Sequence, residues 1–496
     1  RSASHLYLGT VPSGMVLCRY SPPDAHGVTE GMAFLIVLAA LCFLMFAAYR
    51  GYSVILFAPI AALGAVLLTE PSLVAPMFTG LFMDKMVGFL KLYFPVFMLG
   101  AVFGKVIELS GFSRSIVAGT IGLVGRSRAM LSIVLVCALL TYGGVSLFVV
   151  VFAVYPFAAE LFRQSAIPKR LIPGTIALGA FTFTMDSLPG TPQIQNIIPS
   201  SFFGTNGWAA PWLGTLGSLF ILVVGLIYLE SRRRQAAARQ EGYGHDLVNE
   251  PAAFDDGKLA HPLVAVLPLV LVGVANKLLT DAIPRLYGPT QSFVPAVVGK
   301  AEPVVQEVSK VAAIWAVEGA LLLGIVCVIA FAWRPVTRRF AEGSKAAVAG
   351  ALLASMNTAS EYGFGAVIAA LPGFKLVADG LHAIPNPLVN EAVAVTVLAG
   401  VTGSASGGMS IALAAMSQSF IHNAQAAGIP MEVLHRVAAM ASGGMDTLPH
   451  NGAVITLLAV TGLTHRQSYR DIFAVTVIKT VAVFVAIAVF YATGLV

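Results

Sequence analysis

Apolar runs of membrane-spanning length follow one another along almost the whole chain. Of its 496 residues, 57% are hydrophobic and only 11% are charged, whereas an ordinary soluble domain has about 25% charged residues. A bilayer crossing needs roughly 20 apolar residues, so the chain has room for about ten crossings. This pattern excludes a large soluble protein and predicts an all-α polytopic membrane protein.

The start of the chain does not follow this pattern. Residues 1–31 are mixed in polarity, and the chain begins with Arg1 rather than with methionine. A signal peptide would need a continuous apolar run that this stretch lacks. We therefore expect a disordered or mis-assigned N-terminal extension, with Met32 as the initiator.

The remaining residues divide into two halves joined by a polar linker at 231–258. We expect the first half to occupy 32–230 and the second 259–496. The uninterrupted runs predicted as spans or apolar helices are 32–49, 52–69, 88–109, 112–125, 208–230, 259–281, 308–333, 344–361 and 471–494.

Glycines interrupt two of the longer runs. The run at about 129–163 is interrupted at Gly143-Gly144, and the run at about 388–426 is interrupted at Gly403 to Gly408. Each arm is predicted to have 17 residues or fewer, which is short for a crossing. These runs predict two re-entrant hairpins with glycines at the tips.

Prolines interrupt two further runs. The run 171–203 contains Pro189-Gly190-Thr191-Pro192, and the run 430–462 contains Leu448-Pro449-His450-Asn451-Gly452. Proline cannot donate a backbone hydrogen bond and obstructs the preceding helical turn. A freed backbone group in lipid is costly, so such breaks persist only where protein, water or a ligand meets them.

The interrupted segments echo each other between the halves. Met185-Asp186-Ser187-Leu188-Pro189 recurs as Met445-Asp446-Thr447-Leu448-Pro449, and Gly143-Gly144-Val145-Ser146 recurs as Gly407-Gly408-Met409-Ser410. Each half is predicted to have five spans and one hairpin. Because five is odd, the second copy is expected to be inverted, an arrangement typical of secondary transporters with a site at the repeat interface.

Basic residues in the predicted loops set the orientation. Most of the loop lysines and arginines fall on one face together with the linker 231–258, and this face is predicted to be cytoplasmic. Arg436 is among the few basic residues assigned to loops on the opposite face. Glu108 and Glu361 are expected near the membrane edge in interfacial or salt-bridged roles, with Lys105 as a possible partner of Glu108.

The breaks and tips predict an anion site. Each half-helix that begins after a break exposes unpaired N–H groups with partial positive charge, and such ends bind anions. Hydroxyl groups nearby would suit a carboxylate that also carries hydroxyls. The candidate substrate-binding residues are Gly143, Gly144, Ser146, Ser187, Thr191, Ser404, Ser406, Gly407, Gly408, Ser410, Thr447, His450 and Asn451.

Asp186 and Asp446 are the candidate ion-coupling residues. An ionised carboxylate in mid-membrane costs at least about 2.5–3.5 kcal/mol, so it must be paired, protonated or bound to a cation. Uptake of the coupling proton is one interpretation. Capping of the following half-helix is another, and a sodium site made of carbonyls and a carboxylate is a third.

At these motifs the chain resembles the gluconate permease family within the ion-transporter superfamily. The likeness rests on Phe34-Leu-Ile-Val-Leu, Gly51-Tyr-Ser-Val-Ile-Leu, the Met-Asp-Ser-Leu-Pro break and Ser442-Gly-Gly-Met-Asp-Thr-Leu-Pro-His-Asn-Gly-Ala. It implies proton-coupled uptake of a hydroxy acid, homodimers and an elevator-type movement in a bacterial inner membrane. Leu188-Pro-Gly-Thr-Pro-Gln departs from the family's first break and points to the 3-hydroxybutyrate permease-like branch.

The predicted function is therefore proton-coupled symport of a small hydroxycarboxylate, such as a gluconate-type sugar acid or 3-hydroxybutyrate. A sodium-coupled, citrate-like symporter and an anion channel are the alternatives. The expected partners are an organic acid anion, a proton or sodium ion, the bilayer and a second copy of the chain, without nucleic acid. The four cysteines lack metal-ligand spacing, so no metal or cofactor is expected, and no pattern indicates an enzyme.

Overall fold

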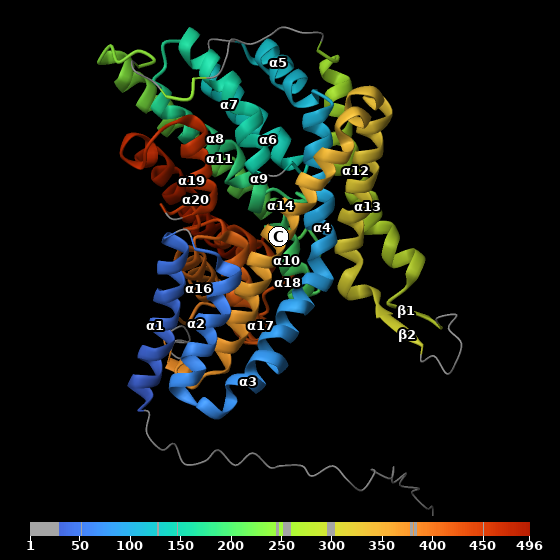
Figure 1. Cartoon of the computed structure of the whole chain (residues 1–496), viewed down its shortest axis with the longest axis vertical. Coiled ribbons are helices and arrows are strands. Elements are labelled where there is room, and N and C mark those ends of the chain that lie inside the picture. Colours follow the sequence, from blue (N-terminus) through green and yellow to red (C-terminus); the bar gives the residue numbers. More distant parts are fainter. Residues whose placement is uncertain are drawn as a thin grey trace, which may run out of the picture.

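The computed structural model describes residues 29–50, 52–125, 128–145, 147–244, 248–250, 259–294, 303–376, 380, 384–449 and 451–496. Almost all of these residues are helical (Figure 1). Six helical segments in this part of the chain are long and apolar enough to cross a membrane. The architecture is that of an all-α polytopic membrane protein. The expected extension at residues 1–31 lies largely outside the described residues.

The first half of the chain forms a series of helices that ends in a long one. The segments are α1 (Glu30–Tyr49), α2 (Val54–Thr69), η1 (Pro71–Leu73), α3 (Val74–Met77), η2 (Phe78–Phe82), α4 (Met83–Leu109), α5 (Phe112–Val124), α6 (Ala129–Tyr142), α7 (Leu147–Gln164), η4 (Lys169–Leu171), α8 (Ile172–Ala180), α9 (Phe183–Asp186), α10 (Ile194–Phe203) and α11 (Pro211–Ala238).

The second half of the chain is also helical, apart from one pair of short strands. Its elements are α12 (Pro262–Tyr287), β1 (Thr290–Phe293), β2 (Val304–Glu307), α13 (Val308–Phe331), α14 (Trp333–Ala370), α16 (Pro387–Thr402), α17 (Ala405–Ala426), α18 (Met431–Ser442), α19 (Gly452–Thr461) and α20 (His465–Thr493). The sequence did not predict the antiparallel pair β1–β2, which projects from the helices between α12 and α13 (Figure 1).

In each predicted hairpin region two helices meet at the glycines, α6 with α7 and α16 with α17, and the second helix of each pair is longer than expected. Helix α7 has 18 residues and α17 has 22, so the limit of 17 residues per arm was wrong. The reason is local: α17 runs on through polar helix-forming residues until Gly428, whose φ of +66° ends it. At 1.5 Å per residue, α17 spans roughly 33 Å.

Both predicted breaks are also present, and each is wider than the prolines alone would make it. The first half-helix stops at Ala180, resumes for the four residues of α9 and stops again at Asp186. The second break already begins after Ser442, at Gly443-Gly444. The next half-helices, α10 and α19, begin at Ile194 and Gly452.

Long helices pack together around the breaks. Helices α4 and α14 pack along each other, and α17 packs on α14 (Figure 1). Helix α18 contacts both α10 and α20, so the second broken helix lies beside the first and beside the last helix. Segments about 250 residues apart in the sequence therefore meet in the interior.

Candidate functional site

One cavity joins the interrupted segments. It has a volume of about 780 Å³, and its walls include Gly144 at the first hairpin tip and Ser404 at the second. They also include Gln193 after the first break, and Asp446 and Asn451 at the second. Cavities of 300–1,000 Å³ are typical of small-ligand sites. Both tips and both breaks therefore face one space.

Helices α10, α17 and α19 are among those that begin at this cavity. Residues Gln193–Gln195 at the start of α10, Ser404–Ser406 at the start of α17 and Asn451–Ala453 at the start of α19 all line it. The first N–H groups of a helix have no partner within the helix, and the helix dipole adds partial positive charge there. The cavity is thus surrounded by backbone suited to an anion.

Each hairpin tip is tied to the neighbouring break by a carboxamide. Gln193, which precedes α10, donates from Nε2 to the carbonyl oxygen of Thr141 at 2.7 Å. Asn451, which precedes α19, donates from Nδ2 to the carbonyl oxygen of Gly403 at 2.7 Å. Because both residues stand at helix starts, the two halves fix their tips by the same device.

Several predicted substrate residues lie on the cavity and others support it. The lining includes Gly144, Ser404, Ser406, Thr447 and Asn451. The backbone at Gly144 has a φ of +94°, a conformation that L side chains rarely adopt. Asn451 accepts from the Val454 N–H at 2.9 Å and so caps α19. Its side chain therefore holds both the break and the tip.

The remaining described candidates make contacts within the protein. Gly143 packs against Leu269, and Gly408 against the backbone of Ala399 in its own hairpin. Ser410 is fully buried and does not line the cavity.

Two candidate hydroxyls are used inside the first break. Ser187 donates to the carboxylate of Asp186 at 2.6 Å, and Thr191 donates to the carbonyl oxygen of Thr184 at 2.7 Å. Ser146 and His450 lie outside the described residues, so their predicted roles are unchanged.

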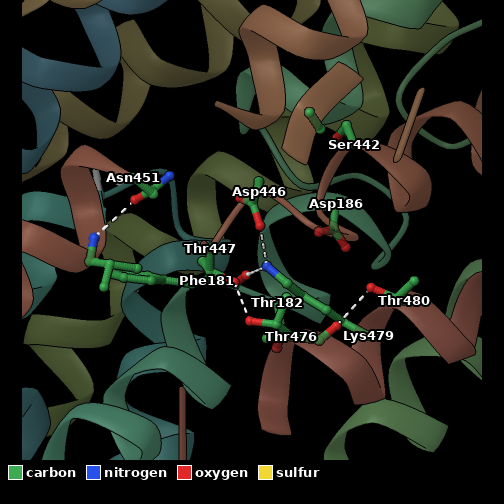
Figure 2. A network of polar contacts seen from close by, with 12 residues as sticks. Phe181, Thr182, Asp186, Ser442, Asp446, Thr447, Asn451, Thr476, Lys479 and Thr480 are labelled. Atoms are coloured by element: carbon green, nitrogen blue, oxygen red, sulfur yellow. Dashed lines mark hydrogen bonds and ion pairs between the residues drawn. The ribbon is translucent and has the colours of Figure 1, made fainter. Parts of the chain in front are cut away.

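A buried ion pair connects the second break to the last helix (Figure 2). The Lys479 ammonium on α20 pairs with Asp446 and donates to the carbonyl oxygen of Phe181 at 3.0 Å. Next to it, the hydroxyls of Thr447 and Thr476 are 2.6 Å apart. Lys479 is 2% exposed. It therefore joins a carboxylate of one break to a carbonyl of the other.

Asp186 has a different environment. Its Oδ1 accepts from Ser187, while its buried Oδ2 has no hydrogen-bond partner among the described residues. Lys479 and Arg436 are the positive charges within electrostatic range. Neither aspartate caps the following half-helix, because Gln193 and Asn451 occupy those positions. The capping interpretation was wrong.

Arg436 is a correction to the predicted topology. It was assigned to a loop, but it is fully buried in α18. Its guanidinium donates to the carbonyl oxygen of Ala209 at 2.7 and 3.1 Å and to Oδ1 of Asn196 at 2.9 Å. It also donates to the carbonyl oxygen of Asp186 at 3.3 Å. Arg436 belongs to the second half of the chain, and it thus fixes the backbone around the first break.

Glu361 is a second correction. It was expected in an interfacial or salt-bridged role, but it is 4% exposed and lines the cavity. The predicted span ended at Glu361, whereas α14 continues to Ala370 and places this residue in the interior. Its counterpart Glu108 does form the expected ion pair with Lys105, at 2.8 Å.

The sequence did not predict that Glu361, Arg436 and Lys479 are buried around the breaks and the cavity. A signal for them was present, because an ionisable residue within an apolar run is costly unless it has a partner or a function. Their partners could not be read from the sequence, since Arg436 contacts residues more than 220 positions away.

Comparison with known proteins gives the family. No family model matches the chain. The chain is 60% identical over 474 residues to a protein named "Uncharacterized transporter YxjC" from Bacillus subtilis (strain 168), and the match covers 94% of this chain and 100% of that protein. The chain belongs to the same transporter family as YxjC. Transport across a membrane is therefore the activity to explain.

The YxjC match supports a transporter but not the gluconate permease branch. Among solved structures, the crystal structure of the Alcanivorax borkumensis YdaH transporter aligns with a TM-score of 0.48 at 14% identity, covering 93% of this chain and 98% of that one. A likeness at this level contributes nothing further to the site.

Proposed function

We propose that this chain is a secondary active transporter that carries a small hydroxycarboxylate together with a proton into a bacterial cell. The observation that supports this proposal best is the single cavity at which α10, α17 and α19 all begin. Three helix starts supply N–H donors and partial positive charge without a free cation. A carboxylate is the ligand that this arrangement suits.

The side chains of the cavity support a hydroxylated substrate of modest size. Ser404, Ser406 and Thr447 offer hydroxyls, and Gln195 and Asn357 offer carboxamides. These groups both donate and accept hydrogen bonds, so they complement the hydroxyls of a sugar acid or of 3-hydroxybutyrate. The wall also contains apolar side chains such as Val96 and Leu321, which favour a compact metabolite.

The Asp446–Lys479 pair favours a proton over sodium as the coupling ion. The sodium alternative required a carboxylate and backbone carbonyls at the breaks. In the structure the ammonium of Lys479 is bound by these groups, namely Asp446 and the carbonyl of Phe181. We infer that Asp186, Asp446 and Lys479 form a buried charge cluster at the breaks, and that the lysine takes the place that a metal cation would have there.

The same proposal includes an inverted repeat and an elevator-type movement in a homodimer in the plasma membrane. The paired tip-to-break contacts of Gln193 and Asn451 support two copies of one unit. A site formed by two inverted copies can be approached from either face. In this proposal the hairpins and broken helices move together with the substrate, and the remaining helices form the scaffold.

A thermal-shift screen of the purified protein tests the substrate class. Gluconate, 3-hydroxybutyrate, lactate and citrate are compared with and without sodium, because a ligand that binds the folded state raises the unfolding temperature. We expect stabilisation by a hydroxy acid, equal in sodium and in potassium. Stabilisation only in sodium would favour the citrate-like alternative. A complete lack of response to hydroxy acids would contradict the proposal.

A further inference from the structure

Glu361 is the carboxylate of the cavity lining that forms no ion pair with a described residue. It is 4% exposed, it lines the cavity, and its Oε2 has no hydrogen-bond partner among the described residues. The other two carboxylates on the cavity wall are paired, Asp446 with Lys479 and Glu108 with Lys105. A buried carboxylate without a cation must take a proton or find strong hydrogen-bond donors.

The donors nearest to Glu361 are at the start of α17. The hydroxyl of Ser404 hydrogen-bonds with the Glu361 carboxyl and accepts from the N–H of Gly407 at 3.0 Å. A Cβ atom at position 407 would collide with Oε2 of Glu361. Glycine at this position therefore lets the carboxyl approach the first turn of α17 closely.

A second polar contact fixes α14 against this hairpin tip. The hydroxyls of Thr358, one turn before Glu361, and Ser406 are 3.3 Å apart. Glu361 is thus held at the start of α17, one of the helix starts that the proposed function assigns to the substrate carboxylate. Two negative groups beside one another at this position would repel each other, so only one of them can be ionised there at a time.

We propose that Glu361 takes up the coupling proton and that its carboxylate competes with the transported carboxylate for the start of α17. This inference rests on the proposed function. In the empty carrier, ionised Glu361 occupies the helix start. A proton from the water in the cavity neutralises Glu361, and the substrate anion takes its place. The net charge of the site is the same before and after loading, because one proton and one carboxylate enter together.

The charged groups around Glu361 are consistent with this competition. On α4, which packs against α14, Lys105 and Glu108 line the same cavity and neutralise each other at 2.8 Å. At the second break, Asp446 is neutralised by Lys479. In the described part of the chain, Ser404 is a polar partner of the Glu361 carboxyl, and none of the ion pairs there includes Glu361. The proton is therefore the cation available to it.

The test is the pH dependence of substrate binding to full-length protein. Radiolabelled 3-hydroxybutyrate and gluconate are bound to purified wild type and to Glu361→Gln between about pH 6 and about pH 8. Above the pH at which Glu361 loses its proton, the affinity of the wild type for the labelled acid should fall about tenfold per pH unit. This slope is expected when one proton binds together with the substrate. The Glu361→Gln variant should bind at all pH values with less than about a twofold change, and it should lose proton-driven accumulation while keeping exchange.

Matched variants separate this result from misfolding. Glu361→Asp keeps a titratable group and should keep the pH dependence. Glu391→Gln removes another fully buried carboxyl, one that does not line the cavity, and should leave the profile as in wild type. If Glu361→Gln kept the full pH dependence, the inference would be overturned while the proposed function stood. If wild type bound neither acid and showed no exchange, both would fall.

Discussion

Lys479 on the last helix lies between two helix breaks that are far apart in the sequence. Its ammonium pairs with Asp446 and donates to the carbonyl oxygen of Phe181 at 3.0 Å (Figure 2). Both side chains are almost completely buried. The Lys479 ammonium neutralises the Asp446 carboxylate. It also donates a hydrogen bond to the Phe181 carbonyl, which follows the end of α8 at the first break. The geometry of the two breaks therefore depends on Lys479.

Replacing Lys479 with methionine should destabilise the protein strongly. The substitution leaves Asp446 buried without a partner, which costs roughly 3–5 kcal/mol in comparable buried pairs. Adding Asp446→Asn should recover most of this loss, because no charge is then stranded. Thermal unfolding of the two single variants and the double variant forms a double-mutant cycle. Additive effects in that cycle would show that the pair is not coupled.

Replacing Arg436 with lysine should also destabilise the protein, although the charge is kept. A single ammonium cannot reproduce the fork with which Arg436 donates to Ala209, Asn196 and the Asp186 carbonyl. Each buried acceptor left unpaired costs about 1–3 kcal/mol. As a control, Arg338→Lys on the exposed surface of α14 should change stability by less than about 0.5 kcal/mol. Equal unfolding temperatures of Arg436→Lys and wild type would contradict this role.

The loop that follows α11 should respond to acid. Glu241 accepts from Arg170 at 2.6 and 2.8 Å, and this guanidinium lowers the pKa of Glu241 below its usual value although burial opposes the shift. The ion pair therefore stabilises the protein fully above the pKa that Glu241 has in the unfolded chain. This stabilisation disappears as the pH falls through the lower pKa that Glu241 has in the folded protein. Because the pair is partly exposed, the effect should be at most about 1 kcal/mol.

Unfolding temperatures of wild type and Glu241→Gln, measured from neutral to acidic pH, check this prediction. The variant should be less stable than wild type at neutral pH, and the difference should vanish in acid. Glu342→Gln, at an exposed position of α14, provides the control and should follow wild type throughout. A difference that stayed constant with pH would mean that the carboxylate charge is not the cause.

The sequence was sufficient to locate the interruptions. Pro189, Pro449 and the two glycine pairs gave the breaks and tips, because these residues restrict the backbone whatever surrounds them. The widths of the breaks were not predictable in the same way. Helix α8 stops at Ala180, and the carbonyl of the next residue, Phe181, accepts a hydrogen bond from Lys479. Because this lysine is about 300 residues away in the sequence, its contact could not be predicted.

The charged interior was harder to predict. Arg436 lies in an amphipathic stretch, which is also typical of a loop edge. Its contacts with Ala209 and Asn196 show that it is buried. The sequence predicted that a span ends at Glu361, because the apolar run ends there. In the structure α14 continues for nine more residues, to Ala370. Such errors have a common cause: a single sequence does not reveal which distant groups compensate a buried charge.

Counterflow in proteoliposomes tests the central claim, that the cavity among the helix breaks carries a hydroxycarboxylate. Vesicles loaded with unlabelled 3-hydroxybutyrate or gluconate receive a trace of labelled acid outside, and a carrier should give a transient, saturable overshoot inside. Ser406→Trp, which fills the cavity at the start of α17, should abolish the overshoot. Ser309→Trp, at an exposed position, should not. Absence of overshoot in wild type, or full activity of Ser406→Trp, would contradict the account.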